Sequence, residues 1–187
     1  MKLKNIVILF SGEGSNLLAI IEQLHQDSCH VVAAITNRPK AAGIAKAKVH
    51  HIPVVVVDHT EFDSREAFDA ELLSAIQNYQ PDLVVMAGFM RILTPTITDH
   101  IRAINVHPSL LPLFKGGNAI VNSFESDERE GGISVHWVSS ELDGGEVIAQ
   151  ASFTKAVNET LESFTFKIRK LEHQLLPQTI VQILKAP

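Results

Sequence analysis

Residues 6–24 read IVILFSGEGSNLLAIIEQL and join three features in one short segment. An apolar run at residues 6–10 leads into a turn with two glycines, and apolar residues at helical spacing follow. An apolar run without polar alternation is typical of a strand buried on both faces. A strand, a glycine turn and a helix in this order predict a parallel sheet covered by helices.

The same alternation continues along the chain. Apolar runs rich in Val and Ile recur, and segments of helical spacing separate them. The further runs are residues 31–35, 52–57 and 83–87, and the helical segments are 41–49 and 62–79. We therefore expect an α/β fold, with a doubly wound and mostly parallel sheet.

The second half of the chain has a different pattern. Residues 133–138 and 147–153 flank the turn sequence Leu142-Asp143-Gly144-Gly145 and are expected to pair as an antiparallel extension. Residues 160–184 predict a long final helix, which Pro177 should bend or break. We expect a single domain over residues 1–187.

Composition narrows the functional classes. The formal net charge of −5 argues against a surface that binds nucleic acid phosphates. A single cysteine, Cys29, allows no internal disulfide and favours a reducing compartment. We find no secretory signal and no apolar stretch approaching the ~20 residues of a membrane span, so a cytoplasmic protein without membrane contact is expected.

The glycine turn is a candidate anion site. Free backbone N–H groups and the positive end of a helix dipole meet at Gly14, Ser15 and Asn16, and Ser15 or Asn16 is expected to cap the helix. Leu17 stands where a dinucleotide fingerprint requires its third glycine, and no Gly-Lys-Ser/Thr follows. The alternative is an ordinary strand-to-helix turn that binds nothing.

A second candidate site lies at Asn105 and His107. If residues 103–107 form a strand, these two side chains project from one face at its carboxyl end, where open α/β sheets bind ligands. An amide donor beside a protonated imidazole suits an oxyanion in acyl transfer, and Asp143 is a candidate to orient the ring and keep it charged. The alternative is a capping His and a turn Asp that do not meet.

Metal chemistry and nucleophilic catalysis are disfavoured by spacing. The nine histidines show no paired-ligand spacing, so no metal site is expected. No G-x-S-x-G nucleophile motif occurs, and Cys29 precedes an apolar run, where a buried structural thiol is expected.

The order of motifs closely resembles the phosphoribosylglycinamide formyltransferase family, the folate-dependent transformylases of purine synthesis. The motifs are S-G-x-G-S-N-L at residues 11–17, DSREAF at 63–68, AGFMRIL at 87–93, N-x-HPSLLP at 105–112 and LDGG at 142–145. They cover nearly the whole chain, and N-x-HPSLLP is highly specific to the superfamily. The resemblance implies a Rossmann-like formyltransferase fold, in which residues 1–100 form the nucleotide-phosphate half and 101–187 the catalytic and folate half.

The resemblance also implies an activity and a set of residues. The activity is formyl transfer from 10-formyltetrahydrofolate to the amine of glycinamide ribonucleotide, without a metal. The catalytic residues would be Asn105, His107 and Asp143. The ribonucleotide would contact Gly14, Ser15, Asn16 and Glu172, and the folate would contact Arg65, Met90, Arg91, Ile92, Leu93 and Asn105.

Simpler explanations exist for parts of the folate set. Met90, Ile92 and Leu93 could be plain core, and Arg65 could pair with Asp69 on a helix surface. Ile120 or Val121 stands where many relatives carry a histidine, so no catalytic role is assigned there.

Three other functions compete with the transformylase activity. A formyltetrahydrofolate deformylase would carry an N-terminal regulatory domain and would not need the phosphate loop. A methionyl-tRNA formyltransferase would carry a C-terminal domain and a basic surface, and a silent nucleotide-binding module could lose His107 and Asp143. We expect small-molecule partners only, and a monomer or a homodimer.

Glu13 remains the odd residue of the phosphate loop. A carboxylate and a phosphate within ~4 Å would repel by several kcal/mol at an effective dielectric near 20, so we expect the Glu13 carboxylate to point away from the phosphate.

Overall fold

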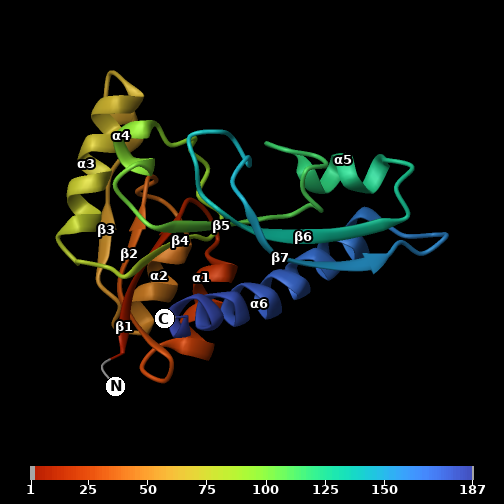
Figure 1. Ribbon diagram of the computed structural model, residues 1–187, viewed down its shortest axis with the longest axis horizontal. Helices are drawn as coiled ribbons and strands as arrows, with labels where there is room; N and C mark the ends of the chain where they lie inside the picture. The colour runs from red at the N-terminus through yellow and green to blue at the C-terminus, as the bar shows by residue number, and fades with distance from the viewer. Residues whose placement is uncertain (1–2, 187) are drawn as a thin grey trace.

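Strand β1 (Lys4–Phe10) is an interior strand of a seven-stranded sheet in the computed structural model, which describes residues 3–186 (Figure 1). The order across the sheet is β3-β2-β1-β4-β5-β6-β7. The other strands are β2 (Cys29–Thr36), β3 (Val54–Val56), β4 (Leu83–Met86), β5 (Ala103–His107), β6 (Glu130–Trp137) and β7 (Val147–Thr154). Strands β3, β2, β1, β4 and β5 are parallel, and β6 and β7 extend the sheet in antiparallel fashion. The predicted fold class is confirmed.

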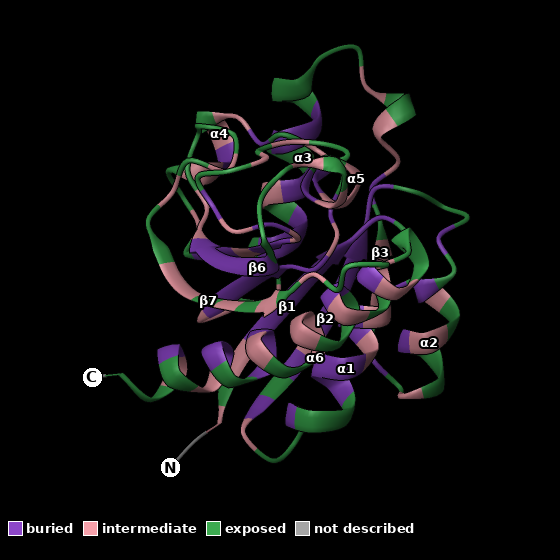
Figure 2. Ribbon diagram, turned by 90° about the vertical axis from the view of Figure 1, so that its right-hand side faces the viewer, coloured by how far each residue is buried: buried purple, intermediate pink, exposed green. Residues whose placement is uncertain are grey.

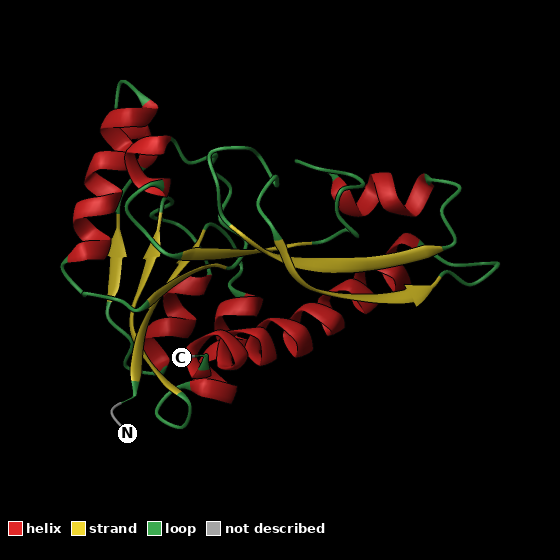
Figure 3. Ribbon diagram, in the orientation of Figure 1, coloured by secondary structure: helices red, strands yellow, loops and turns green. Residues whose placement is uncertain are grey.

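Helices cover both faces of this sheet, as Figure 3 shows. They are α1 (Ser15–Leu24), α2 (Gly43–Val49), α3 (Arg65–Gln77), α4 (Pro95–Thr98), α5 (Ala119–Glu125) and α6 (Leu161–Lys185), with a 3₁₀ turn η1 (His59–Glu61). The short helices α4 and α5 were not expected from the sequence. Of the helices in residues 3–186, none is long and apolar enough to cross a membrane.

Side-chain alternation along the strands divides the core into two layers. On β1, Ile6, Ile8 and Phe10 pack with α1 and α6 on one face. Val7 and Leu9 pack on the other face, with Phe68 and Leu72 of α3. The central strands are therefore buried on both sides, as Figure 2 shows, and this is why their sequences are apolar throughout.

The predicted capping of α1 by Ser15 or Asn16 is wrong. Both residues lie inside the first turn, and Gly14 is the N-cap with φ 69°, so no side chain caps the helix. A Cβ on Gly14 would lie 2.7 Å from Gly43 Cα, because α2 packs directly against the loop. Close packing requires glycine here, and the first amides of α1 are left without a side-chain cap.

The sequence predicts that Pro177 bends or breaks the last helix, and the predicted break does not occur. Helix α6 continues through Pro177 to Lys185. Proline removes the N–H that would bond to the carbonyl four residues earlier, at His173. That carbonyl accepts instead from Gln23 Nε2 of α1 at 2.9 Å, so a neighbouring helix satisfies the freed oxygen.

Candidate active site

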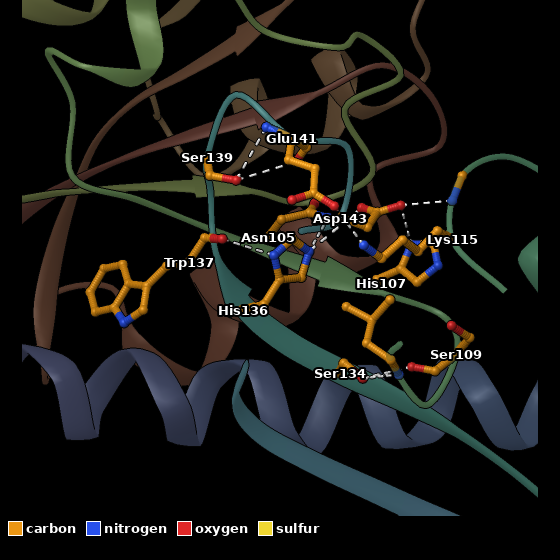
Figure 4. A network of polar contacts seen from close by, with 12 residues as sticks. Asn105, His107, Ser109, Lys115, Ser134, His136, Trp137, Ser139, Glu141 and Asp143 are labelled. Carbon is orange, nitrogen blue, oxygen red and sulfur yellow. Dashed lines mark hydrogen bonds and ion pairs between the residues drawn. The ribbon is translucent and has the colours of Figure 1, made fainter. Parts of the chain in front are cut away.

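Strand β5 brings Asn105 and His107 to the carboxyl end of the parallel sheet. The two residues are on one face of the strand, and antiparallel pairing sets His136 of β6 directly opposite Asn105. The Asn105 Nδ2 atom lies 3.1 Å from His136 Nε2. Figure 4 shows the three side chains converging with Asp143.

His107 is held by contacts at both ring nitrogens. Its Nε2 lies 2.8 Å from the Phe114 carbonyl oxygen, and its Nδ1 lies 3.4 Å from Asp143 Oδ2. The residue is buried. Because both neighbours are acceptors, the arrangement suits an imidazole that carries a proton on each nitrogen.

Asp143 occupies the loop between β6 and β7 with φ 47°. Its Oδ2 accepts from the Gly116 amide at 2.8 Å, and its Oδ1 lies 3.6 Å from His136 Nε2. Burial alone would raise the pKa of this carboxyl, but His136, the Gly116 amide and the charge of His107 together lower the pKa below its usual value. The carboxylate is therefore charged at neutral pH, and the predicted meeting of Asn105, His107 and Asp143 is observed.

His136 was missed in the sequence, where it counted as one scattered histidine. Its Nδ1 lies 2.9 Å from the Trp137 carbonyl oxygen, and its Nε2 lies 3.1 Å from Asn105 Nδ2. This contact fixes one N–H of Asn105 and leaves the other for a ligand. The sequence indicated only that polar and apolar side chains alternate over residues 133–138, as they do in a strand.

The loop that follows β5 is tied down by buried hydroxyl groups. Ser109 Oγ donates to the Leu113 carbonyl at 2.6 Å, and Ser134 Oγ donates to the Ser109 carbonyl at 2.7 Å. The Leu111 amide donates to Ser134 Oγ at 2.9 Å. These bonds hold the backbone that presents the Phe114 carbonyl to His107.

A cavity of about 770 Å³ opens beside these residues. It reaches from Asn16 and Glu172 at one end, past the loop after β4, to His107 and Asp143. Ile120 and Val121 of α5 are also on its wall, where they offer only apolar surface. A smaller adjoining cavity of about 80 Å³ is lined by Asn105, His136 and the loop after β4. One continuous recess therefore joins the polar cluster to Asn16, while Gly14 and Ser15 are not on its lining.

Glu172, at the end of the cavity next to Asn16, has a carboxyl group with a raised pKa. Asn16 Nδ2 donates to Glu172 Oε2 at 3.1 Å, which joins α1 to α6. Burial raises the pKa of Glu172 to about 7, against the opposing effects of Asn16 and the charge of Arg169. Among the described contacts, the buried Asn16 Oδ1 has no hydrogen-bond partner.

The Glu13 carboxylate lies 3.7 Å from Arg169 Nη2, and both side chains are exposed. The carboxylate thus faces a cation of α6. Whether it also avoids a bound phosphate stays a prediction.

The predicted folate residues separate into distinct environments. Met90 and Ile92 are 67% and 42% exposed and lie on the cavity wall, so the plain-core explanation does not hold for them. Leu93 is 4% exposed and packs in the core below α3, although it also lines the smaller cavity. The Arg91 guanidinium lies over the Phe68 ring, 5.2 Å from its centroid.

Arg65 is the first residue of α3 and is exposed, and it is not among the residues that line these two cavities. Its expected surface partner, Asp69, is buried and accepts instead from the Thr94 amide and hydroxyl at 2.6 and 2.8 Å. Within residues 3–186 no group of three or more His, Cys, Asp or Glu side chains could hold a metal ion.

Comparisons with known proteins agree with this geometry. The model of the formyl transferase family matches residues 4–180. Phosphoribosylglycinamide formyltransferase of Escherichia coli (strain K12) is 41% identical over 180 residues, which cover 94% of this chain and 85% of that protein. Trifunctional purine biosynthetic protein adenosine-3 of Drosophila melanogaster is 35% identical over 186 residues, but this chain spans only 14% of its length.

A solved structure is also similar over nearly its full length. The crystal structure of phosphoribosylglycinamide formyltransferase from Campylobacter jejuni subsp. jejuni NCTC 11168 has a TM-score of 0.96 and 46% sequence identity, and the match covers 98% of this chain and 99% of that one. A family match over residues 4–180 and a shared fold at this identity lead to one conclusion: the chain belongs to the formyl transferase family.

Proposed function

We propose that this formyl transferase moves the formyl group of 10-formyltetrahydrofolate to the amine of glycinamide ribonucleotide, giving formylglycinamide ribonucleotide and tetrahydrofolate. The observation that carries the proposal is the common cavity, which holds Asn16 and Glu172 at one end and Asn105, His107 and Asp143 at the other. The relatives named as phosphoribosylglycinamide formyltransferases support the same substrate.

In the proposed binding mode, the ribonucleotide phosphate lies at the amides of Gly14, Ser15 and Asn16, where the first turn of α1 has no side-chain cap. Glu172 would lie near the ribonucleotide, where Asn16 Nδ2 donates to its Oε2 at 3.1 Å. A flat pterin suits the apolar wall at Met90 and Ile92, whose exposed side chains border the cavity. Arg91, Leu93 and Arg65 are further proposed folate contacts.

The chemistry begins when the amine nitrogen attacks the formyl carbon and a tetrahedral oxyanion forms. The free N–H of Asn105 and the protonated ring of His107 would donate to that oxygen. Collapse breaks the bond between the formyl carbon and N10 of the folate. N10 takes up a proton, for which His107 is the proposed source directly or through water, and the attacking amine loses one.

Asp143 keeps the His107 ring oriented and favours its charged form, since its carboxylate lies 3.4 Å from Nδ1. The Phe114 carbonyl occupies Nε2 at 2.8 Å. For Nε2 to reach substrate, that contact must be exchanged. We therefore propose that the 108–118 loop shifts when substrate binds.

The whole chain would act as one formyl transferase domain, whose first 100 residues bind the phosphate and whose remainder provides catalysis. The division is not strict, because Arg65 and Met90–Leu93 of the first part are assigned to folate and Glu172 of the second part to the ribonucleotide. We further propose a protein that acts in the cytoplasm as a monomer or homodimer on small molecules, without nucleic acid or membrane partners.

The test is an assay of 10-formyltetrahydrofolate turnover with and without glycinamide ribonucleotide. We expect tetrahydrofolate and formylated ribonucleotide to appear in equal amounts, and only when both substrates are present. Release of formate in the absence of the ribonucleotide would instead favour a deformylase. No product with either mixture would refute the proposed activity.

A further inference from the structure

Ser11 connects two segments that are far apart in the sequence. It follows β1 and opens the 11–16 loop proposed to bind phosphate. Its amide donates to the Gly88 carbonyl at 3.0 Å, and its hydroxyl oxygen accepts from the Met90 amide at 2.8 Å. Two polar groups of one buried residue are therefore bonded to the turn that begins the proposed folate wall.

The direction of these bonds is fixed by their chemistry. An amide N–H can only donate, so Ser11 Oγ must accept from Met90, and its own proton is free for another acceptor. That acceptor is Asn37 Oδ1, at 2.5 Å. Ser11 and Asn37 are 2% and 1% exposed, so water cannot replace either partner.

Within the turn at residues 88–90, Phe89 is buried and packs in the core with Phe68 of α3, whereas its two neighbours are not packed there. Met90 is 67% exposed, so its side chain is not packed in a core. Gly88 has φ 77°, and a Cβ placed there would meet no atom within 4 Å. Hydrogen bonds to Ser11 on either side of Phe89, at the Gly88 carbonyl and the Met90 amide, therefore hold this backbone together with the packing of the Phe89 ring.

We infer that Ser11 is a positioning residue that joins the two substrate sites, because it keeps the Met90 backbone in register with the phosphate loop without touching either substrate. The inference rests on the proposed placement of phosphate at residues 14–16 and of folate at 90–93. Loss of the Ser11 hydroxyl should therefore affect the folate site and spare the phosphate loop. The Ser11 amide bond to Gly88 survives truncation to alanine, so the phosphate loop keeps its place, whereas the Met90 amide loses its acceptor.

The experiment is steady-state kinetics of Ser11→Ala. We expect the KM for 10-formyltetrahydrofolate to rise about tenfold, the size of one lost hydrogen bond to a buried group, with kcat and the KM for glycinamide ribonucleotide within about twofold of the parent. A general loss of folded protein would lower the apparent kcat and leave both KM values unchanged. A folate KM within about twofold of the parent would overturn the inference.

Two further variants test whether the Ser11 hydroxyl itself, rather than the residues around it, affects the folate KM. Asn37→Ala leaves the bond between Ser11 Oγ and the Met90 amide possible, so it should raise the folate KM less than Ser11→Ala does; an equal or larger rise would contradict the argument. Thr179→Val is the matched control, because Thr179 is also 1% exposed and its hydroxyl bonds only within α6, at the Leu175 carbonyl. It should leave both KM values unchanged.

A charged substitution in the folate wall shows whether a negative result refutes the proposed folate site or only the role of Ser11. If Ile92→Asp leaves the folate KM unchanged, the proposed folate site is wrong and the inference falls with it. If Ile92→Asp raises that KM and Ser11→Ala does not, the folate site stands and only the role of Ser11 is refuted.

Hydrogen exchange tests the same bond without any variant. The Met90 amide should exchange at least about tenfold more slowly than an unstructured amide, despite the exposed side chain, because it donates to a buried hydroxyl. Exchange at the rate of an unstructured peptide would overturn the inference.

Discussion

Replacing Asp143 by asparagine removes a negative charge but nearly preserves the shape of the side chain. The charge lies 3.4 Å from His107 Nδ1, and the two side chains are only 6% and 8% exposed, so solvent and salt screen the pair weakly. At an effective dielectric near 20, unit charges at this separation attract by about 5 kcal/mol. The asparagine oxygen can still accept from the Gly116 amide, which stabilises the loop.

We expect Asp143→Asn to lower kcat/KM by about 10²- to 10³-fold, which is about 3–4 kcal/mol of transition-state stabilisation. This is less than the full Coulomb energy, because the amide dipole and nearby water recover a part. The assay is the initial rate of tetrahydrofolate formation with both substrates, alongside circular dichroism to confirm the fold. A loss of activity below about threefold in a folded variant would refute the role of the carboxylate.

The chain offers a matched control in Asp58. Its Oδ1 lies 3.9 Å from His59 Nδ1, so the two form another Asp–His pair, but this pair is more exposed and lies outside the cavity lining. Asp58→Asn removes the same charge from the protein. It should leave kcat/KM within about twofold, and a large loss there would mean that net charge, rather than the contact with His107, controls the rate.

Three further changes test the surroundings of the site. Burial raises the pKa of Glu172 to about 7, so between about pH 4.5 and 7 the folded state keeps a proton that the unfolded state releases. The free energy of unfolding measured in urea should therefore fall by about 3 kcal/mol as the pH rises across this window, and should be level above it. Glu172→Gln should remove this fall. Gly14→Ala puts a Cβ 2.7 Å from Gly43 Cα at a φ of 69° and should cost about 2 kcal/mol or more in urea unfolding, with a larger rise in KM for the ribonucleotide than for the folate. Lys155 Nζ donates to the Ser126 and Ser123 carbonyls at 2.9 and 2.8 Å at the end of α5, so Lys155→Met should lower stability by about 2 kcal/mol, whereas exposed Lys185→Met should change thermal unfolding little.

The side-chain pattern of one segment could place Asn105 and His107 together, whereas Asp143, from another segment, entered as a candidate partner and through the family resemblance. Asn105 and His107 are two apart on a strand, so the side-chain period alone places them together. His136 could not be found in this way, because its contact with Asn105 depends on the register between β5 and β6. That register is set by pairing of strands from distant parts of the chain, and the alternation within residues 133–138 does not specify it.

The two mistaken local predictions have a common physical cause. Capping rules assign the first amides of α1 a partner among Ser15 and Asn16, and the rule for Pro177 leaves the His173 carbonyl without one. Both rules count only partners from the same segment. In the fold, α2 packs so closely on the α1 loop that glycine becomes the N-cap, and Gln23 of α1 supplies the donor that α6 lacks. Helix α1 thus leaves its own first amides uncapped at the end proposed to bind phosphate, and at its other end it satisfies the proline-containing helix that carries Glu172.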